Sequence, residues 1–384
     1  MTTNNNPKKL TLTERLVPPL KSVGQGPNAL RYTSPSPAWS VDFSRDGLFL
    51  AVCYGAPDPC VRVWKRRNNN NAATTSTAAA KPKLEMDKEP QETWILHSTL
   101  EGIHARTIRS VAFAPLANPY VLAAASFDAS VSIWELSTDQ QQQQQQQQPT
   151  KQQEWECTTQ LEGHDHEIKA VTWNATGSLL ATCGRDKTVW VWETWLDGSI
   201  GGSSSNEFEC IAVLNGSEGD VKCIQFAPSH GQWGDGDEIL ISAGYDDTIR
   251  IWAEDAGDWY CAMTLDNIHT DTIWSLTLAP GGGRLVSASA DGSIAICKGY
   301  TTAERNAMEK NSTDSTGDTQ VFTNGLWKCV GRLPNAHSST IYSVHYAPAK
   351  AGHGRIASGG ADNKIQIYRE VMGSSSDEPK FTLD

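Results

Sequence analysis

Apolar and polar residues alternate along most of the chain in short runs that are separated by turn residues. The stretch from Trp155 to Glu193 shows this most clearly, because its four runs (CTTQL, IKAVTW, SLLATC and TVWVWE) are divided by turn residues at Gly163, 174–177 and 184–187. Alternation with a period of two indicates strands, and the turns between them indicate antiparallel connections. The stretch therefore predicts a four-stranded sheet with two apolar faces, which needs a neighbour on each side.

The same pattern occurs six times. Each copy has an Asp in its last turn, at positions Asp58, Asp128, Asp186, Asp246, Asp291 and Asp362, and ends in a hydrophobic run closed by Trp64, Trp134, Trp192, Trp252, Cys297 or Tyr368. A repeat of about 40–45 residues with a Gly-His start and a Trp-Asp type of ending is typical of WD repeats, whose four-stranded blades pack around an axis. We therefore predict an all-β WD-repeat β-propeller.

The third repeat contains a set of polar residues that can satisfy one another when buried. An Asp that accepts from a His, which in turn meets a hydroxyl group and an indole N–H, leaves no buried donor unpaired; the residues are His164, Thr182, Asp186 and Trp192. A hydrolytic triad is the alternative, but partial copies of the set recur in other repeats, whereas a catalytic constellation is needed once. Repeat four has Ser217 in place of the His and repeat two has Ala124 in place of the hydroxyl, so we expect weaker networks there.

Residues 1–12 are expected to be disordered, and residues 13–384 to form one propeller domain with polar or low-complexity insertions at about 65–91, 137–153, 196–206 and 299–321. The second insertion contains the polyglutamine run 140–148, which we interpret as inert. All four lie between the third and fourth strands of a blade, so they emerge on one side of the disc. The segment 13–22, TERLVPPLKS, is expected to act as an outer strand that closes the ring.

Composition narrows the class of partner. The net charge of −12 argues against nucleic acid, which is bound by clustered Lys and Arg. No apolar run approaches the about 18 residues of a membrane span, and the start of the chain lacks a signal peptide, so we expect no membrane association and a cytoplasmic location, with the nucleus as a second compartment. Four of the nine Cys recur on outer strands, one per blade, and are expected to be small buried hydrophobic residues that serve packing: Cys157, Cys210, Cys261 and Cys329. We predict no metal and no cofactor.

The side of the disc opposite the insertions is predicted to be a binding face. Long cations and aromatics recur on that side, residue types that are enriched in binding hot spots. On first strands they are Trp39, Arg109, Lys169, Lys222, Trp274 and Tyr342, and beside the turn Asp they are Phe127, Arg185 and Tyr245. We expect these side chains to point into solvent and to bind an acidic, aromatic-bearing peptide or protein surface. The alternative is that they only cap the mouth of the channel.

Several stretches resemble one family of WD-repeat proteins. These are EWECTTQLEGHDHEIKAVTW, LLATCGRDKTVWVWE, AAASFDASVSIW, AGYDDTIRIW and DTIWSLTLAP, which are similar to blades of the cytosolic iron-sulfur protein assembly WD-repeat scaffold. The ring of Arg109, Lys169, Lys222, Trp274 and Tyr342 also resembles that family. The resemblance implies as partners a small DUF59-type assembly factor, a large HEAT-repeat adaptor and client iron-sulfur apoproteins. It also implies that Arg185 is a surface binding residue, the alternative being a salt bridge to a neighbouring turn.

The family has seven blades, whereas this chain ends at FTLD (381–384), where a seventh repeat would begin. A change from sevenfold to sixfold pitch would disturb every packed interface, so we expect a seven-bladed arrangement whose last blade is incomplete. We predict a non-enzymatic scaffold in cytosolic iron-sulfur protein assembly. The alternative binding function is a substrate receptor of a ubiquitin ligase or a signalling adaptor. Since paired carboxylates, metal-ligand spacing and a phosphate loop are missing from the sequence of the face, an enzyme is disfavoured.

Overall fold

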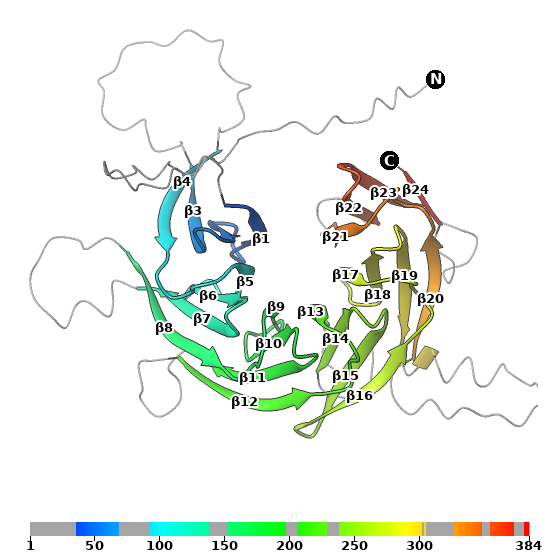
Figure 1. Ribbon diagram of the computed structural model, residues 1–384, viewed down its shortest axis with the longest axis horizontal. Helices are drawn as coiled ribbons and strands as arrows, with labels where there is room; N and C mark the ends of the chain where they lie inside the picture. Colours follow the sequence, from blue (N-terminus) through cyan, green and yellow to red (C-terminus); the bar gives the residue numbers. More distant parts are fainter. Residues whose placement is uncertain are drawn as a thin grey trace, which may run out of the picture.

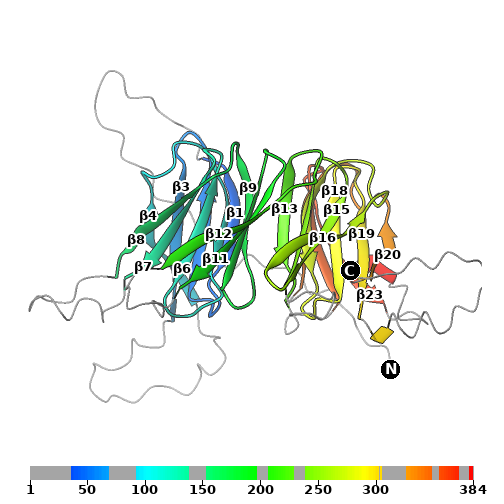
Figure 2. The same ribbon diagram turned by 90° about the horizontal axis from the view of Figure 1, so that it is seen from below.

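The computed structural model describes residues 36–68, 92–137, 153–196, 206–228, 238–301, 303–304, 326–347, 354–371 and 380–383. Six antiparallel sheets are each built from four consecutive strands, which confirms the predicted all-β propeller. The first strand of each sheet lines the inner side of a ring, and the fourth strand lies on the outer side (Figure 1). Seen from below, the blades stand side by side across the disc (Figure 2).

The first three blades contain the following strands. Blade 1 consists of β1 (Ala38–Phe43), β2 (Phe49–Tyr54), β3 (Cys60–Asn68) and β4 (Glu92–Leu100). Blade 2 consists of β5 (Ile108–Phe113), β6 (Val121–Ser126), β7 (Ser130–Leu136) and β8 (Trp155–Glu162). Blade 3 consists of β9 (Ile168–Trp173), β10 (Leu179–Gly184), β11 (Val189–Trp195) and β12 (Glu207–Leu214).

The last three blades follow the same order. Blade 4 consists of β13 (Val221–Phe226), β14 (Ile239–Gly244), β15 (Ile249–Asp255) and β16 (Asp258–Leu265). Blade 5 consists of β17 (Ile273–Leu278), β18 (Arg284–Ser289), β19 (Ile294–Tyr300) and β20 (Leu326–Leu333). Blade 6 consists of β21 (Ile341–Tyr346), β22 (Arg355–Gly360), β23 (Ile365–Val371) and β24 (Lys380–Leu383).

The apolar core is divided among the interfaces between neighbouring blades. Between blades 3 and 4, for example, Val191 of β11 packs in one cluster with Ile224 of β13 and Leu240 of β14. Second strands face a neighbouring blade on both sides, and every residue of β6 and β14 is buried. Each fully buried aliphatic side chain contributes about 1.5–3 kcal/mol. The blades therefore stabilise one another, which explains why the motif must be repeated.

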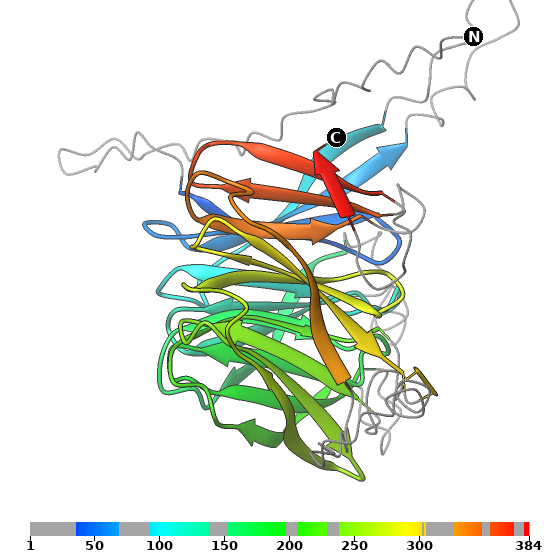
Figure 3. The ribbon, with the colours of Figure 1, turned by 90° about the vertical axis from the view of Figure 1, so that its right-hand side faces the viewer.

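The strand bounds correct part of the predicted domain plan. Strand β3 continues to Asn68 and β19 continues to Tyr300, so residues 65–68 and 299–300 belong to strands and not to insertions. Most of the four predicted insertions, and the whole of segments 1–12 and 13–22, lie outside the described residues. The FTL at 381–383 forms part of β24, the outer strand of blade 6, next to β23 (Figure 3).

The six blades form an arc that is open between β1 and β21 (Figure 1). On both sides of the opening, side chains that are buried in other blades are uncovered. Val41 of β1 is 58% exposed, whereas Val111, at the same position of β5, is 4% exposed. Ile365 of β23 is 78% exposed, whereas Ile294 of β19 is fully buried. Each end of the arc therefore presents a bare blade face with the pattern of a packed interface.

Candidate docking face

One side of the disc carries the turns between second and third strands and the loops that lead into the first strands. The second residue of every first strand interrupts the regular pairing with the second strand, as a β-bulge does. Bulges re-aim a side chain, and the residues at this position are the predicted ring Trp39, Arg109, Lys169, Lys222, Trp274 and Tyr342. The residue before it is buried in five of the six blades, so each ring residue stands on an anchored strand end.

The ring cations of blades 2 and 3 each lie over an aromatic side chain of the preceding blade. The Arg109 guanidinium lies 5.2 Å from the ring centre of Trp39 in blade 1. The Lys169 ammonium lies 4.1 Å from the ring of Phe127, which belongs to the turn of blade 2. Such contacts stabilise by about 0.5–2 kcal/mol each, depending on desolvation. The ring of side chains therefore connects one blade to the next.

Blades 4–6 contribute an aromatic group centred on Trp274. The Lys222 ammonium lies 3.7 Å from the ring of Tyr245 and 5.4 Å from that of Trp274. Trp274 meets Tyr245 and Tyr342 edge-on, with ring centres 5.9 and 5.4 Å apart. Tyr245 and Tyr342 are exposed, so this part of the face offers aromatic surface to a partner.

The expectation that all ring cations point into solvent is wrong for Lys222. Its side chain is only 8% exposed, because the ammonium forms a 3.0 Å ion pair with Asp220 and lies over two aromatic rings. Arg109 and Lys169 are half-buried, and desolvation lowers the pKa of both, with Lys222 adding to the effect at Lys169. Arg109, Lys169 and Lys222 therefore pack against aromatic side chains and are only partly accessible to solvent.

Sequence analysis missed one arginine and two carboxylates, which are Arg106, Glu167 and Asp220. Glu167, just before β9, accepts from Arg106 at 2.9 Å and from Arg185 at 3.3 Å. Burial opposes ionisation of Glu167, but the hydrogen bonds from Arg106, the backbone and Arg185, together with the charge of Lys169, outweigh it and lower the pKa of Glu167 to about 2. The salt bridge considered for Arg185 is thus present, yet 58% of the Arg185 side chain remains exposed. Glu167 and Asp220 each stand two residues before a ring lysine, a spacing that could have pointed to them.

The face is not basic throughout. Acidic residues gather on the same side of blades 4 and 5, where Asp247 has its pKa raised by burial and by the charges of Asp271, Asp246 and Asp291. Cations dominate in blades 2 and 3, with Arg106, Arg109, Lys169 and Arg185. The face therefore has a basic half and an acidic, aromatic half.

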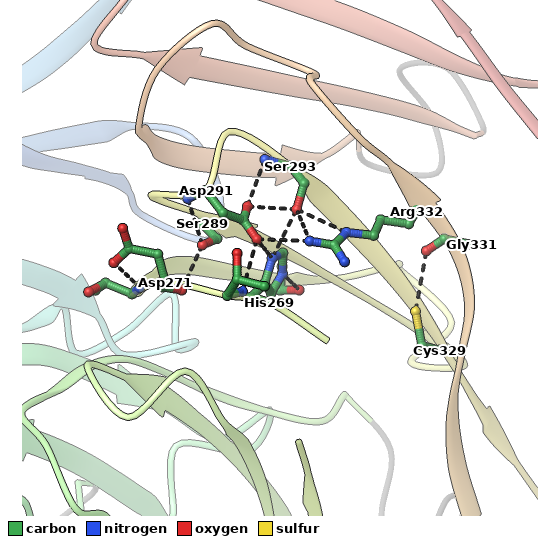
Figure 4. A network of polar contacts seen from close by, with 11 residues as sticks. His269, Asp271, Ser289, Asp291, Ser293, Cys329, Gly331 and Arg332 are labelled. Carbon is green, nitrogen blue, oxygen red and sulfur yellow. Dashed lines mark hydrogen bonds and ion pairs between the residues drawn. The ribbon is translucent and has the colours of Figure 1, made fainter. Parts of the chain in front are cut away.

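Beneath the face, hydrogen bonds between polar side chains connect the loops and strands of blades 2–6. In blade 3, His164 Nδ1 lies 2.6 Å from Asp186 Oδ2 and its Nε2 lies 2.9 Å from Thr182 Oγ1, which also accepts from Trp192 Nε1 at 3.2 Å. Blade 5 repeats this with His269, Asp291 and Ser287, and Arg332 of β20 adds a 2.9 Å contact to Asp291 (Figure 4). These networks fix the turns from which the face is built.

The weaker networks expected in blades 2 and 4 are not observed. In blade 2, Ser132 of β7 takes the place of the hydroxyl missing at Ala124 and lies 2.8 Å from His104 Nε2. In blade 4, the guanidinium of Arg250 takes the place of the missing His and contacts Asp246 at 2.6 Å and Ser217 at 3.3 Å. Ser132 and Arg250 both come from the third strand of their blade. The sequence analysis considered only the loop and the second strand for these positions.

A cavity of about 470 Å³ lies away from this face, near the loops between first and second strands of blades 5 and 6. Its charged groups are paired, Arg284 with Glu370 at 2.9 Å and Lys298 with Glu304 at 3.4 Å. Among the described residues, no three potential metal ligands come together. The residues that the structure describes also contain no helix that is long and apolar enough to span a membrane.

Comparison with known proteins agrees with this architecture. The family model for the WD domain, G-beta repeat, matches residues 29–65, 155–193, 208–253, 259–297 and 327–369. A protein of Botryotinia fuckeliana named "Probable cytosolic iron-sulfur protein assembly protein 1" is 32% identical over 325 residues, which cover 72% of this chain and 71% of the relative. Its counterpart of the same name in Meyerozyma guilliermondii is 35% identical over 320 residues, 75% of this chain and 78% of the relative.

This chain belongs to that family of WD-repeat proteins. A relative from Schizosaccharomyces pombe, named as a cytosolic Fe-S cluster assembly factor, is 35% identical over 277 residues, 72% of this chain and 39% of the relative. The resemblance predicted from the sequence is therefore confirmed.

Proposed function

We propose that this protein is a non-enzymatic scaffold of cytosolic iron-sulfur protein assembly that binds protein partners on the docking face. The relatives named above are cytosolic assembly proteins, and the same cytoplasmic location is proposed here. The observation that carries the binding role is the set of cation–aromatic and aromatic contacts among the first-strand ends and turns of blades 1–3 and of blades 4–6, with Tyr245, Tyr342 and Arg185 exposed beside them. Aromatic side chains and Arg are the residue types on which interface energy concentrates.

The proposed binding residues are those of the ring and its turns: Trp39, Arg109, Lys169, Arg185, Lys222, Tyr245, Trp274 and Tyr342. The proposed partners are a DUF59-type assembly factor, a HEAT-repeat adaptor and client iron-sulfur apoproteins, in which the cluster is the cargo. The division of the face into a basic half and an acidic, aromatic half suits a partner whose own surface is charged in the opposite order. Rigid blades hold these residues in place, so little ordering is needed on binding.

The second candidate is a substrate receptor of a ubiquitin ligase or a signalling adaptor, because a propeller face can serve any of these roles. Affinity purification of the full chain from its native cell, analysed by mass spectrometry, separates the candidates. The proposal predicts that iron-sulfur assembly factors and apoproteins are enriched. Enrichment of ligase or G-protein components without any assembly factor would contradict it.

We further propose that a seventh four-stranded blade completes the ring between β23 and β1. The bare faces support this, since Val41 and Phe43 on one side and Ile365 on the other are uncovered only at the opening. An additional sheet would bury both sets, as the six observed blades bury theirs. Closure would also complete the docking face between Tyr342 and Trp39.

A further inference from the structure

Blade 5 has a cysteine at the position where blades 1–4 have Trp and blade 6 has Tyr. β19 reads IAICKGY, with Cys297 in place of the Trp. In the antiparallel pairing of β19 with β20, Cys297 lies directly opposite Cys329. Comparison of the four outer-strand cysteines with one another did not reveal this partner, because Cys297 lies on a different strand.

The equivalent cysteines of blades 2–4 are opposite tryptophans. Cys157 pairs with Trp134, Cys210 with Trp192 and Cys261 with Trp252. None of these can form a disulfide with its partner. Among the described blades, the exchange of Trp for Cys makes a dithiol only in blade 5.

The geometry of the pair fits a disulfide bond. Residues directly opposite in antiparallel strands have Cα atoms about 4.5–5.5 Å apart, within the about 4.4–6.8 Å that a disulfide spans. Both cysteines are free thiols, and Cys297 is fully buried. Cys329 is exposed, as are Cys210 and Cys261, so the expectation that the outer-strand cysteines are buried is wrong for three of the four. Side chains of directly opposite residues lie on the same face of a sheet, so the two thiols are neighbours. A reagent in solvent therefore reaches the exposed Cys329 before the buried Cys297, its neighbour across the strands.

We propose that Cys329 is a peroxide-reactive thiol and that Cys297 converts its oxidation product into a cross-strand disulfide. In the first step the Cys329 thiolate attacks one oxygen of hydrogen peroxide, the O–O bond breaks, and the released hydroxide takes up a proton to leave as water. Cys329 is then a sulfenic acid. In the second step the Cys297 sulfur attacks the Cys329 sulfur, the S–O bond breaks, and the second water leaves with the Cys297 proton. Two thiols are oxidised and one peroxide is reduced to two waters.

The surroundings of Cys329 favour its thiolate, the form that reacts. The hydrogen bond from Cys297 is the main cause that lowers the pKa of Cys329 to about 6; partial burial opposes it, and the charge of Arg332 assists it. Arg332 is held by Asp291 at 2.9 Å and by Ser293 at 3.2 Å, as Figure 4 shows for β20. The pKa of Cys297 is raised by the same hydrogen bond and by burial, so Cys297 remains the protonated partner until Cys329 has reacted.

The test is oxidation of the full-length chain with hydrogen peroxide at pH 7, followed by non-reducing peptide mapping. We expect two thiols to be lost, with one cross-linked peptide joining Cys297 to Cys329 that dithiothreitol reverses. The cross-link should be abolished in Cys329→Ser and in Cys297→Ser. It should persist in Cys261→Ser, the matched control, because Cys261 is also exposed on an outer strand but is opposite Trp252.

A second measurement on the unaltered chain does not depend on the folding of variants. At pH 6.5, Cys329 should react with iodoacetamide about fivefold faster than Cys261, since a larger thiolate fraction outweighs the lower nucleophilicity of a low-pKa thiol. Equal alkylation rates, or a folded protein in which peroxide produces no Cys297–Cys329 cross-link, would overturn the proposal. Neither result bears on the docking face, so the two proposals fail independently.

Discussion

At the scale of single residues, the blades depend on buried polar groups that satisfy one another. His164 of blade 3 is almost wholly buried between an Asp and a Thr. Its removal would take one hydrogen bond from each partner, and an unsatisfied buried polar group costs about 1–3 kcal/mol. The substitution should therefore lower the free energy of unfolding and leave partner binding unchanged, because the His side chain does not reach the docking face.

His164→Ala should therefore lower the free energy of unfolding by about 2–3 kcal/mol. Chemical denaturation measures this directly. His166→Ala is the matched control, because His166 lies in the same loop but is exposed, and surface substitutions change stability by less than about 0.5 kcal/mol. Equal effects of the two substitutions would show that the network does not tie the blade.

The same networks make stability dependent on pH in the acid range. Burial alone would raise the pKa of Asp128 and Asp291, but hydrogen bonds from His104 and Ser130 in blade 2, and from Ser293 and Thr270 in blade 5, lower both to about 2. A carboxyl group with a depressed folded-state pKa stabilises the protein above its unfolded pKa near 3.8, and this contribution is lost as pH falls toward 2.

The melting temperature should fall between pH 5 and pH 3, and the fall should be smaller in Asp291→Asn. That variant is less stable at pH 7 because it has lost the charge, and the difference from the unaltered protein should narrow at pH 3. Thermal unfolding followed by circular dichroism across this range measures both effects. A constant difference across the range would contradict the assignment.

At the scale of strands and blades, most of the fold could be predicted from the sequence and the finer contacts could not. Alternation with a period of two identified every blade, because each strand has one face toward a neighbouring blade. It did not identify Ser132 and Arg250 as substitutes in the networks, because those side chains come from strand positions that carry no such group in blade 3. It also missed the pairing of Cys297 with Cys329, which depends on register between strands.

The docking face could also be predicted only in part from the sequence. The positions of the ring residues follow from the repeat, and the structure places them around one side of the disc. Burial of Lys222 could not be predicted, because it results from Tyr245 and Trp274, which come from different blades. Glu167 as a shared acceptor for Arg106 and Arg185 was missed for the same reason.

The exposed face of blade 1 predicts how a charged substitution on its first strand, β1, affects stability. In the chain of 384 residues, Val41→Asp should change the free energy of unfolding by less than about 0.5 kcal/mol, because Val41 is 58% exposed. Val111→Asp, the same substitution at the equivalent position of β5, buries an unpaired charge and should cost at least about 3 kcal/mol. Urea denaturation of the two variants measures the difference.

A version of the protein with a seventh repeat added after residue 384 provides the comparison for ring closure. There Val41→Asp should become as destabilising as Val111→Asp, since the added blade would cover β1. If Val41→Asp remained harmless in the extended protein, the proposed closure would be wrong.

At the scale of the whole molecule, the contacts that support the fold and the proposed docking face lie in different parts of the disc. The blade interfaces and polar networks hold the strands, and the bulged ends of the first strands present cations and aromatics on one side. The chain divides this side into a basic half in blades 2 and 3 and an acidic, aromatic half in blades 4 to 6. This division of charge is the basis of the proposed binding role.

The most direct test of this account is the affinity of Arg185→Glu for the assembly partners recovered with the full chain, measured together with its melting temperature. Arg185 is largely exposed and lies beside Glu167 on the face, so binding should weaken by at least about tenfold, equivalent to about 1.4 kcal/mol, while the melting temperature stays nearly constant. Lys187→Glu, an equal charge change in the same turn but outside the ring, should bind normally. Unchanged binding by Arg185→Glu, or equal losses in both variants, would contradict the account.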